Sequence, residues 1–375
     1  MICCINCFKD TEIRAAIEMI GHIGDCPVCR NRNTWIYDSE KDADKTNVGE
    51  MLDAILELYV PESELPTLYP EDEEMLIEDR LLKDWSIFSG SSHEVKQIVS
   101  EYVSESLDLD SRIAIERVGI PQLFDETYLK DNSIMGKYSW DVFKKYLRNE
   151  NRFHSKYINL EILESVLKET EIIIPAGTKF YRARVSDKSG YSRKEMWAPP
   201  DDVASPGRVN SKGQSCLYLC SHRKTTVKEI RAHAFDYVTI ATFKLNRNVR
   251  VLDLSSIVHS SPFYTENDKV AYLVNESTLR QIQNDMAKPM SRLDSDLDYL
   301  PTQYISDFAK FLGYDGVKYF STFDKASYNV ALFDSSACDC TYHRNFLIGV
   351  GGIIEPTEKK LDFTGFSLAW LGSLV

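Results

Sequence analysis

The sequence predicts an α+β protein in which a helical region precedes a largely antiparallel sheet. Apolar residues recur at helical spacing over much of the stretch from residue 47 to residue 170. After Glu171 the pattern changes to short runs of β-branched and aromatic residues separated by turn residues. Few helical stretches lie between these runs, so the regular strand–helix alternation of a parallel sheet is missing. The chain contains neither a P-loop nor a G-x-G-x-x-G motif, so nothing supports a Walker or Rossmann nucleotide site.

Length and composition fit a globular protein of two or three domains. The chain has 375 residues, of which 43% are hydrophobic and 27% are charged, which is enough to bury a sizeable core. We predict a cysteine-rich knuckle at residues 1–35, an acidic helical domain at 36–170 and a sheet domain at 171–375. The chain shows no apolar run of membrane-spanning length and no signal-peptide layout at its start. We therefore expect a cytoplasmic protein without a membrane partner.

The negative charge is concentrated in one segment. Residues 36–110 hold five Lys or Arg against 21 Asp or Glu, within a chain whose net charge is −13. A segment of this charge repels phosphate backbones, which argues against nucleic acid as the main partner. A solvated acidic helical surface explains this concentration of acidic residues better than an acidic docking surface does.

Two C-x-x-C pairs near the N-terminus predict a metal site. Cys4 and Cys7 form the first pair, and Cys26 and Cys29 form the second. Each pair can place two thiolates on one tight turn, and two such turns complete a tetrahedral zinc site. Because four sulfur ligands leave no open position, we expect a structural Zn²⁺ that supplies folding energy to a small ribbon.

Helix signals follow from about residue 47. Asn47 with Glu50, and Ser91 with Glu94, each have the spacing of a capping box at a helix start. Apolar residues follow each pair at helical intervals. Further helical stretches are predicted around residue 113 and at 140–147 and 160–167.

Arg148 and His154 form an Arg-x5-His pair within this helical region. The spacing resembles the RNase motif of HEPN helical domains, in which such residues serve as charge stabiliser and acid or base. A helix-end Arg and an unrelated His explain the pair better, so RNA cleavage or RNA binding is kept only as an alternative function.

The region after residue 171 predicts a series of strands and two helices. The strands are expected at residues 172–174, 179–185, 216–220, 237–245, 249–254, 317–320 and 329–333, and the helices at 226–233 and 304–312.

Five short motifs occur in order through this region of the chain. They are Tyr181-Arg182, Gly207-Arg208-Val209-Asn210, Leu217-Tyr218-Leu219, Glu229 eleven residues after Tyr218, and Tyr319-Phe320-Ser321. In this order they resemble the RES domain family over about residues 172–335. Val209 departs from the family pattern, which has an aromatic residue there. The knuckle and the helices look like an extension found on a subset of RES proteins.

The resemblance implies a fold related to ADP-ribosyltransferases and an activity that consumes NAD⁺. It implies that Glu229 stabilises the ribosyl cation, that Arg208 and Arg182 hold the pyrophosphate, and that Ser321 fixes the ribose or carboxamide. Arg184 is an alternative phosphate ligand, Tyr181 or Tyr218 would stack on nicotinamide, and Asn210 would contact the cofactor. These residue types suit the cleavage of NAD⁺. One carboxylate can stabilise an oxocarbenium-like transition state, and the guanidinium of Arg can bind pyrophosphate with two parallel hydrogen bonds.

Simpler interpretations exist for three of these residues. Glu229 follows Thr226 at capping-box spacing, Tyr218 lies between two Leu as a core residue would, and Ser321 could merely end a strand. The family match favours the functional interpretation of Glu229.

The expected function is NAD⁺ cleavage by hydrolysis or phosphorolysis, in a toxin or defence effector. An inhibitory antitoxin or a regulatory protein is the partner that the resemblance implies. The oligomeric state of the protein stays open. ADP-ribosylation of a macromolecule through the same pocket is the alternative. The sequence leaves the acceptor and the role of residues 336–375 open.

Overall fold

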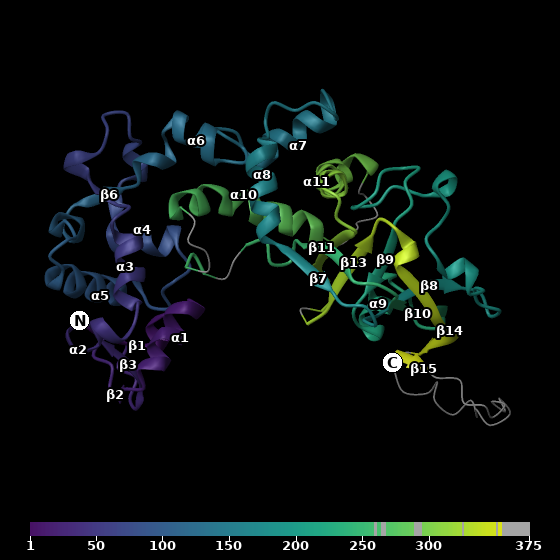
Figure 1. Cartoon of the computed structure of the whole chain (residues 1–375), viewed down its shortest axis with the longest axis horizontal. Helices are drawn as coiled ribbons and strands as arrows, with labels where there is room; N and C mark the ends of the chain where they lie inside the picture. The colour runs from purple at the N-terminus through teal and green to yellow at the C-terminus, as the bar shows by residue number, and fades with distance from the viewer. Residues whose placement is uncertain (259–260, 264–267, 289–294, 325, 350–351, 355–375) are drawn as a thin grey trace, which may run out of the picture. The chain divides into compact units, whose positions relative to one another are not determined.

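The computed structural model describes residues 1–258, 261–263, 268–288, 295–324, 326–349 and 352–354. It combines helices with a C-terminal, antiparallel-rich sheet (Figure 1), so the predicted α+β class is confirmed. The chain forms two compact units, one of Met1–Ile172 with Leu252–Ile305, the other of Ile173–Val251 with the residues from Ser306 on. Residues 252–305, which the sequence analysis places in the sheet domain, fold with the N-terminal unit.

The N-terminal unit contains two small three-stranded sheets and most of the helices. One sheet has the order β1-β3-β2 and the other the order β4-β6-β5. The strands are β1 (Ile2–Cys4), β2 (Ile23–Gly24), β3 (Thr34–Asp38), β4 (Val60–Pro61), β5 (Met75–Leu76) and β6 (Arg117–Gly119). The helices are α1 (Thr11–Ile20), α2 (Ser39–Asp42), α3 (Val48–Leu56), α4 (Ile77–Asp84), α5 (Ser92–Glu105), α6 (Glu126–Asn132), α7 (Trp140–Asn149), α8 (Leu160–Glu169) and α10 (Lys269–Ala287).

The two predicted capping boxes have different outcomes. Ser91 and Glu94 make both reciprocal bonds at the start of α5. Asn47 precedes α3 as predicted but its side chain makes no capping bond, because its backbone (φ −90°, ψ 16°) is not in the extended conformation of a capping residue. The capping box predicted there is therefore wrong, while the helix itself is present.

Helix α10 explains why residues 252–305 belong to the N-terminal unit. Asn275 accepts a hydrogen bond from the Ile134 amide (2.7 Å) and donates to the Asn132 carbonyl (2.8 Å). The Trp140 indole donates to Asp285 at 2.8 Å. Val270 joins the main apolar core of the unit. These contacts tie a segment that comes late in the chain into a core built mainly from its first third.

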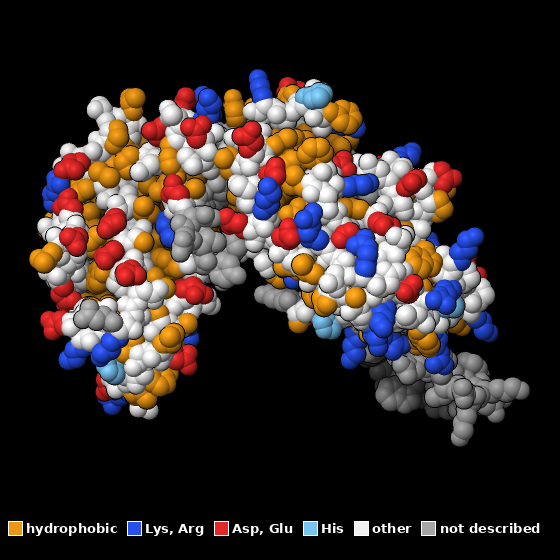
Figure 2. Space-filling model, in the orientation of Figure 1, with side chains coloured by type: hydrophobic (Ala, Val, Ile, Leu, Met, Phe, Trp, Pro, Cys, Tyr) orange, Lys and Arg blue, Asp and Glu red, His pale blue; other side chains and the backbone are white. Residues whose placement is uncertain are grey.

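Most acidic side chains of residues 36–110 are exposed or partly exposed, whereas Asp38, Asp42, Glu78 and Asp84 are buried. Figure 2 shows acidic side chains spread over this part of the N-terminal unit with few basic ones between them. The apolar stripes of α3 and α5 instead face the core, which holds Leu52, Ile55, Val95 and Val99. Within the described residues, no helix is both long and apolar enough to cross a membrane.

A nine-stranded sheet dominates the second unit. Its strand order is β15-β14-β10-β8-β9-β13-β12-β11-β7, and the central pairs β10/β8, β8/β9, β9/β13 and β13/β12 are antiparallel. The strands are β7 (Glu171–Ile174), β8 (Lys179–Ser186), β9 (Leu217–Cys220), β10 (Tyr237–Leu245), β11 (Val249–Asp253), β12 (Gly316–Phe320), β13 (Tyr328–Leu332), β14 (Cys338–Gly349) and β15 (Gly352–Ile354).

Two helices complete the elements around this sheet. Helix α9 (Arg223–Glu229) lies against β8 and β9, and α11 (Leu300–Phe311) crosses the boundary between the units in sequence. Val227 of α9 packs into a cluster of buried strand residues that includes Ala183, Ile240 and Phe346. This packing holds the C-terminal end of α9, and therefore Glu229, over the middle of the sheet.

Candidate active site and metal centre

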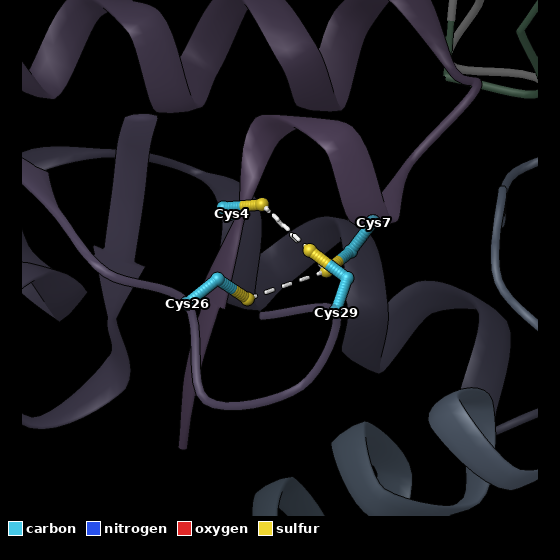
Figure 3. A group of neighbouring side chains, drawn as sticks. All are labelled: Cys4, Cys7, Cys26 and Cys29. Carbon is cyan, nitrogen blue, oxygen red and sulfur yellow. Dashed lines mark hydrogen bonds between the residues drawn. The ribbon is translucent and has the colours of Figure 1, made fainter. Parts of the chain in front are cut away.

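The four predicted metal ligands lie together in the N-terminal unit. The sulfur atoms of Cys4, Cys7, Cys26 and Cys29 all lie within 4.8 Å of one another. Figure 3 shows their side chains converging from two turns, with sulfur separations of 3.4 Å (Cys4–Cys29) and 3.7 Å (Cys7–Cys26). None of the four forms a disulfide. The sequence alone therefore located this cluster correctly.

The cluster has the dimensions of a zinc site. A tetrahedron with metal–sulfur bonds of about 2.3 Å has sulfur–sulfur edges of about 3.8 Å, close to the separations found here. The Asn31 amide donates to the Cys29 sulfur at 3.2 Å, as an outer-shell partner of a thiolate does. The residues fit a structural Zn²⁺, which would crosslink the two turns and leave no position for a substrate.

We expect one zinc ion per chain, measured by inductively coupled plasma mass spectrometry. Chelation should unfold the ribbon and lower the midpoint of thermal unfolding, because binding energy of about 10 kcal/mol or more couples to folding at such sites. Cys26→Ser should lose the metal. Cys3→Ala is the matched control, since Cys3 is buried opposite Tyr37 and is not in the cluster. Equal zinc content in the wild type and Cys26→Ser would contradict the assignment.

In the second unit, Glu229 is held by two hydrogen-bond donors. The Ser321 hydroxyl donates to Oε1 at 2.6 Å, and the Asn329 amide donates to the same oxygen at 2.9 Å. The Phe323 backbone amide donates to Ser321 Oγ at 3.3 Å, which directs the hydroxyl hydrogen toward Glu229. The carboxylate is therefore fixed by Ser321, which directly follows β12, and by Asn329 of β13, which lie 92 and 100 residues further along the chain.

The structure excludes the capping-box interpretation of Glu229. Helix α9 starts at Arg223 after the N-cap residue His222, and Glu229 is its last residue. Thr226 lies in the middle of the helix and donates to the Tyr181 carbonyl. Glu229 is thus at the wrong end of the helix to satisfy N-terminal amides. Its second oxygen, Oε2, accepts no hydrogen bond from the residues that the structure describes.

Asn329 is the site residue that the sequence analysis missed. It was predicted only as the start of a strand. In the structure it faces Tyr319 on one side and Cys220 on the other in the antiparallel register. A polar residue at the start of an apolar strand, eight positions after the Ser of a motif, was the signal that could have identified it.

Tyr319 is a buried residue influenced by the charges of both Glu229 and Arg208. Burial raises the pKa of Tyr319, and the charges of Arg208 and Glu229 act on it in opposite directions. Arg208 also acts on Tyr218, whose pKa is raised by burial. The charge of Arg208 thus acts on two buried tyrosines, and the charge of Glu229 acts on one of them.

The Gly207–Asn210 turn is held by Tyr218. The Tyr218 hydroxyl donates to Asn210 Oδ1 at 2.6 Å and accepts from the Val209 amide at 3.1 Å. Asn210 donates to three backbone carbonyls of its own loop, those of Ser205, Ser211 and Gln214. Any Cβ at position 207 would lie 2.6 Å from the Tyr218 hydroxyl, so the turn needs glycine. In this structure Tyr218 and Asn210 shape the loop that carries Arg208, and their proposed contacts with a cofactor stay predictions.

Arg182 on β8 carries a buried charge without a complete set of partners. Its Nη1 is buried and has no hydrogen-bond partner among the described residues. Burial, followed by the charge of Arg184, lowers the pKa of Arg182 to about 10. A buried guanidinium nitrogen without a partner among the described residues is suited to binding an anion.

Arg184 differs from Arg182 because its interactions are local. It donates to the Glu195 carbonyl and lies over the Tyr191 ring, 4.6 Å from the ring centroid. Of the two strand arginines, Arg182 is therefore the better candidate for a phosphate ligand. Tyr181 directly precedes Arg182 on β8, lies opposite Thr242 and Cys220 in register, and is partly buried.

Arg148 and His154 do not form a recognisable catalytic pair. The Arg148 guanidinium forms an ion pair with Asp298. His154 is exposed, and its backbone is bound by Asn151 and by the Tyr146 hydroxyl. These contacts match the structural interpretation of the two residues.

Residues 179–348 match the model of one protein family, described as the RES domain. Among solved structures, the chain resembles the crystal structure of the M. tuberculosis MbcT–MbcA toxin–antitoxin complex, with 13% identity and a TM-score of 0.31. That match covers 49% of this chain and 92% of the other. No curated protein matches.

Proposed function

Because residues 179–348 of this chain are a RES domain, we propose that the protein cleaves the nicotinamide–ribose bond of NAD⁺. The observation that carries the proposal is the Glu229 carboxylate, with one oxygen bound by Ser321 and Asn329 and the other without a hydrogen bond among the described residues. The nicotinamide leaves as a neutral molecule from a cationic ring, so its departure needs no general acid. What the reaction needs is stabilisation of positive charge at the ribose, which one oriented carboxylate supplies.

The remaining residues have complementary roles in this proposal. Arg182 and Arg208 would bind the two negative charges of the pyrophosphate, Arg182 through the unpartnered Nη1. Ser321 and Asn329 would act as positioning residues, since they contact the carboxylate rather than the substrate. Tyr181 would offer its ring to nicotinamide. The second substrate, water or phosphate, would attack the ribosyl cation opposite the departing ring.

In a cell, this activity would deplete NAD⁺ and make the protein a toxin or a defence effector. A partner that blocks the site, such as an antitoxin, would then be required for growth.

Purified full-length protein incubated with NAD⁺ should release nicotinamide, detected by liquid chromatography. Free ADP-ribose would identify water as the acceptor, and ADP-ribose phosphate would identify phosphate. Nicotinamide without a free co-product, together with label from ³²P-NAD⁺ on a macromolecule, would instead support the ADP-ribosyltransferase alternative. Release no faster than that of Glu229→Gln, over hours at micromolar protein, would contradict the proposal.

A further inference from the structure

A pocket in the N-terminal unit contains none of the residues proposed for NAD⁺ cleavage. It has a volume of about 720 Å³ and is formed by α6, the loop before α7 and the start of α8. Volumes of about 300–1,000 Å³ are typical of small-molecule sites. The residues that matter for its chemistry are two tyrosines and three lysines, namely Tyr138, Tyr157, Lys130, Lys137 and Lys156.

The aromatic part of the pocket is rigid and partly open. The Tyr138 and Tyr157 rings meet edge to face with centroids 4.6 Å apart, and Tyr146 contacts Tyr157 in the same way at 4.8 Å. Tyr157 is supported from both sides, whereas Tyr138 is 39% exposed. Tyr138 therefore presents a fixed aromatic surface on which a flat ring can stack.

The lysines differ in how far their charges are already neutralised. Lys137 is paired with Glu126 at 2.9 Å. Lys130 and Lys156 have no carboxylate partner among the residues that the structure describes, and Lys156 lies 5.5 Å from the Tyr157 ring centroid. Glu161 at the start of α8 also lines the pocket, so the pocket has three basic and two acidic side chains. Two ammonium groups thus remain available to an anionic ligand.

We propose that this pocket binds a nucleotide, with its base on Tyr138 and its phosphate between Lys130 and Lys156. A nucleotide combines a flat aromatic ring with a negative charge at short range, which matches an open tyrosine beside two available lysines. The bound group is a free nucleotide or one nucleotide of a single strand, and both share this chemistry. The lining residues all belong to the N-terminal unit and none is a proposed RES-site residue, so binding here would be a recognition function of that unit.

Isothermal titration calorimetry of the full-length protein with AMP, and with a single-stranded RNA hexamer, tests the proposal. We expect Tyr138→Leu to weaken binding by about fivefold or more, while Tyr138→Phe retains it, because loss of one stacking partner costs about 1–3 kcal/mol. Lys130→Gln with Lys156→Gln should also weaken binding at least about fivefold. Tighter binding of the hexamer than of AMP would identify a strand as the source, and the reverse would identify a free nucleotide.

Controls separate this pocket from the NAD⁺ site, which could also bind AMP. Lys145→Gln changes an exposed lysine outside the pocket, and Arg208→Ala changes the RES site, so both should leave this binding event unchanged. Hydrogen exchange should show protection by the ligand within residues 126–161. The proposal is overturned if neither probe binds at millimolar concentration, or if the Tyr138 and lysine variants bind normally. It is also overturned if only Arg208→Ala abolishes binding. Equally tight binding of a polyglutamate peptide of equal charge would overturn it as well.

Discussion

Glu229→Gln should reduce nicotinamide release by at least about 100-fold, as expected when one preorganised group that stabilises transition-state charge is removed. Glutamine keeps an oxygen that can accept from Ser321 and Asn329, so the local structure should survive. The negative charge is lost, and with it the stabilisation of the ribosyl cation. Turnover is measured by chromatography of nicotinamide, and folding by circular dichroism and the unfolding midpoint.

Asp202→Asn provides the matched control for this charge change. Asp202 is an exposed acid in the same unit, and its variant should turn over NAD⁺ at the wild-type rate. Asn329→Ala tests the positioning role separately: kcat should fall while KM changes little, because Asn329 orients the carboxylate without contacting the substrate. A Glu229→Gln enzyme with the wild-type rate would show that the carboxylate is not part of the chemistry.

Arg182→Met should make the protein more stable and less active. The wild-type residue has a buried guanidinium nitrogen without a partner in the described part of the chain, and removing such a charge relieves a desolvation cost. We expect the unfolding midpoint of the sheet unit to rise by about 2–4 °C. The KM for NAD⁺ should rise at least about tenfold, because a charge-assisted contact with the pyrophosphate is lost.

The direction of the pKa shift gives this prediction a second test. Since the folded-state pKa of Arg182 is lowered to about 10, its charge destabilises the wild-type fold at every pH below that value. The cost fades only as the pH rises above about 10. The stability advantage of Arg182→Met should therefore be constant across neutral pH, as measured by urea unfolding.

Arg184→Met is the matched control, because Arg184 already binds the Glu195 carbonyl and the Tyr191 ring. Its loss should lower stability rather than raise it. Lower stability of the Arg182→Met variant would contradict the interpretation of the wild-type guanidinium as an anion-binding group that costs stability.

The sequence predicted elements and local clusters better than long-range partnerships. The four cysteines could be paired from spacing, because each pair lies on one turn and zinc geometry dictates the rest. Glu229 could be identified only through the order of motifs, and the capping-box spacing beside it was misleading since the helix starts three residues earlier. The hydrogen bonds from Ser321 and Asn329 span about a hundred residues, and no local pattern encodes them.

The domain assignment of residues 252–305 also depends on long-range contacts. The sequence places them in the predicted sheet domain at 171–375. The side chain of Asn275, the indole of Trp140 and the apolar Val270 instead tie them to the N-terminal unit. Such tertiary contacts override the order of the chain, and single-sequence patterns do not report them.

This arrangement also dictates the order in which the protein can mature on the ribosome. Glu229 is synthesised before the segment that completes the N-terminal unit, while Ser321 and Asn329 are synthesised after it. The carboxylate therefore cannot be oriented until residues 252–305 have left the ribosome and can fold. A nascent chain that stalls within that segment would carry Glu229 without its two hydrogen-bond donors, so an incomplete copy of this protein would lack a finished active site.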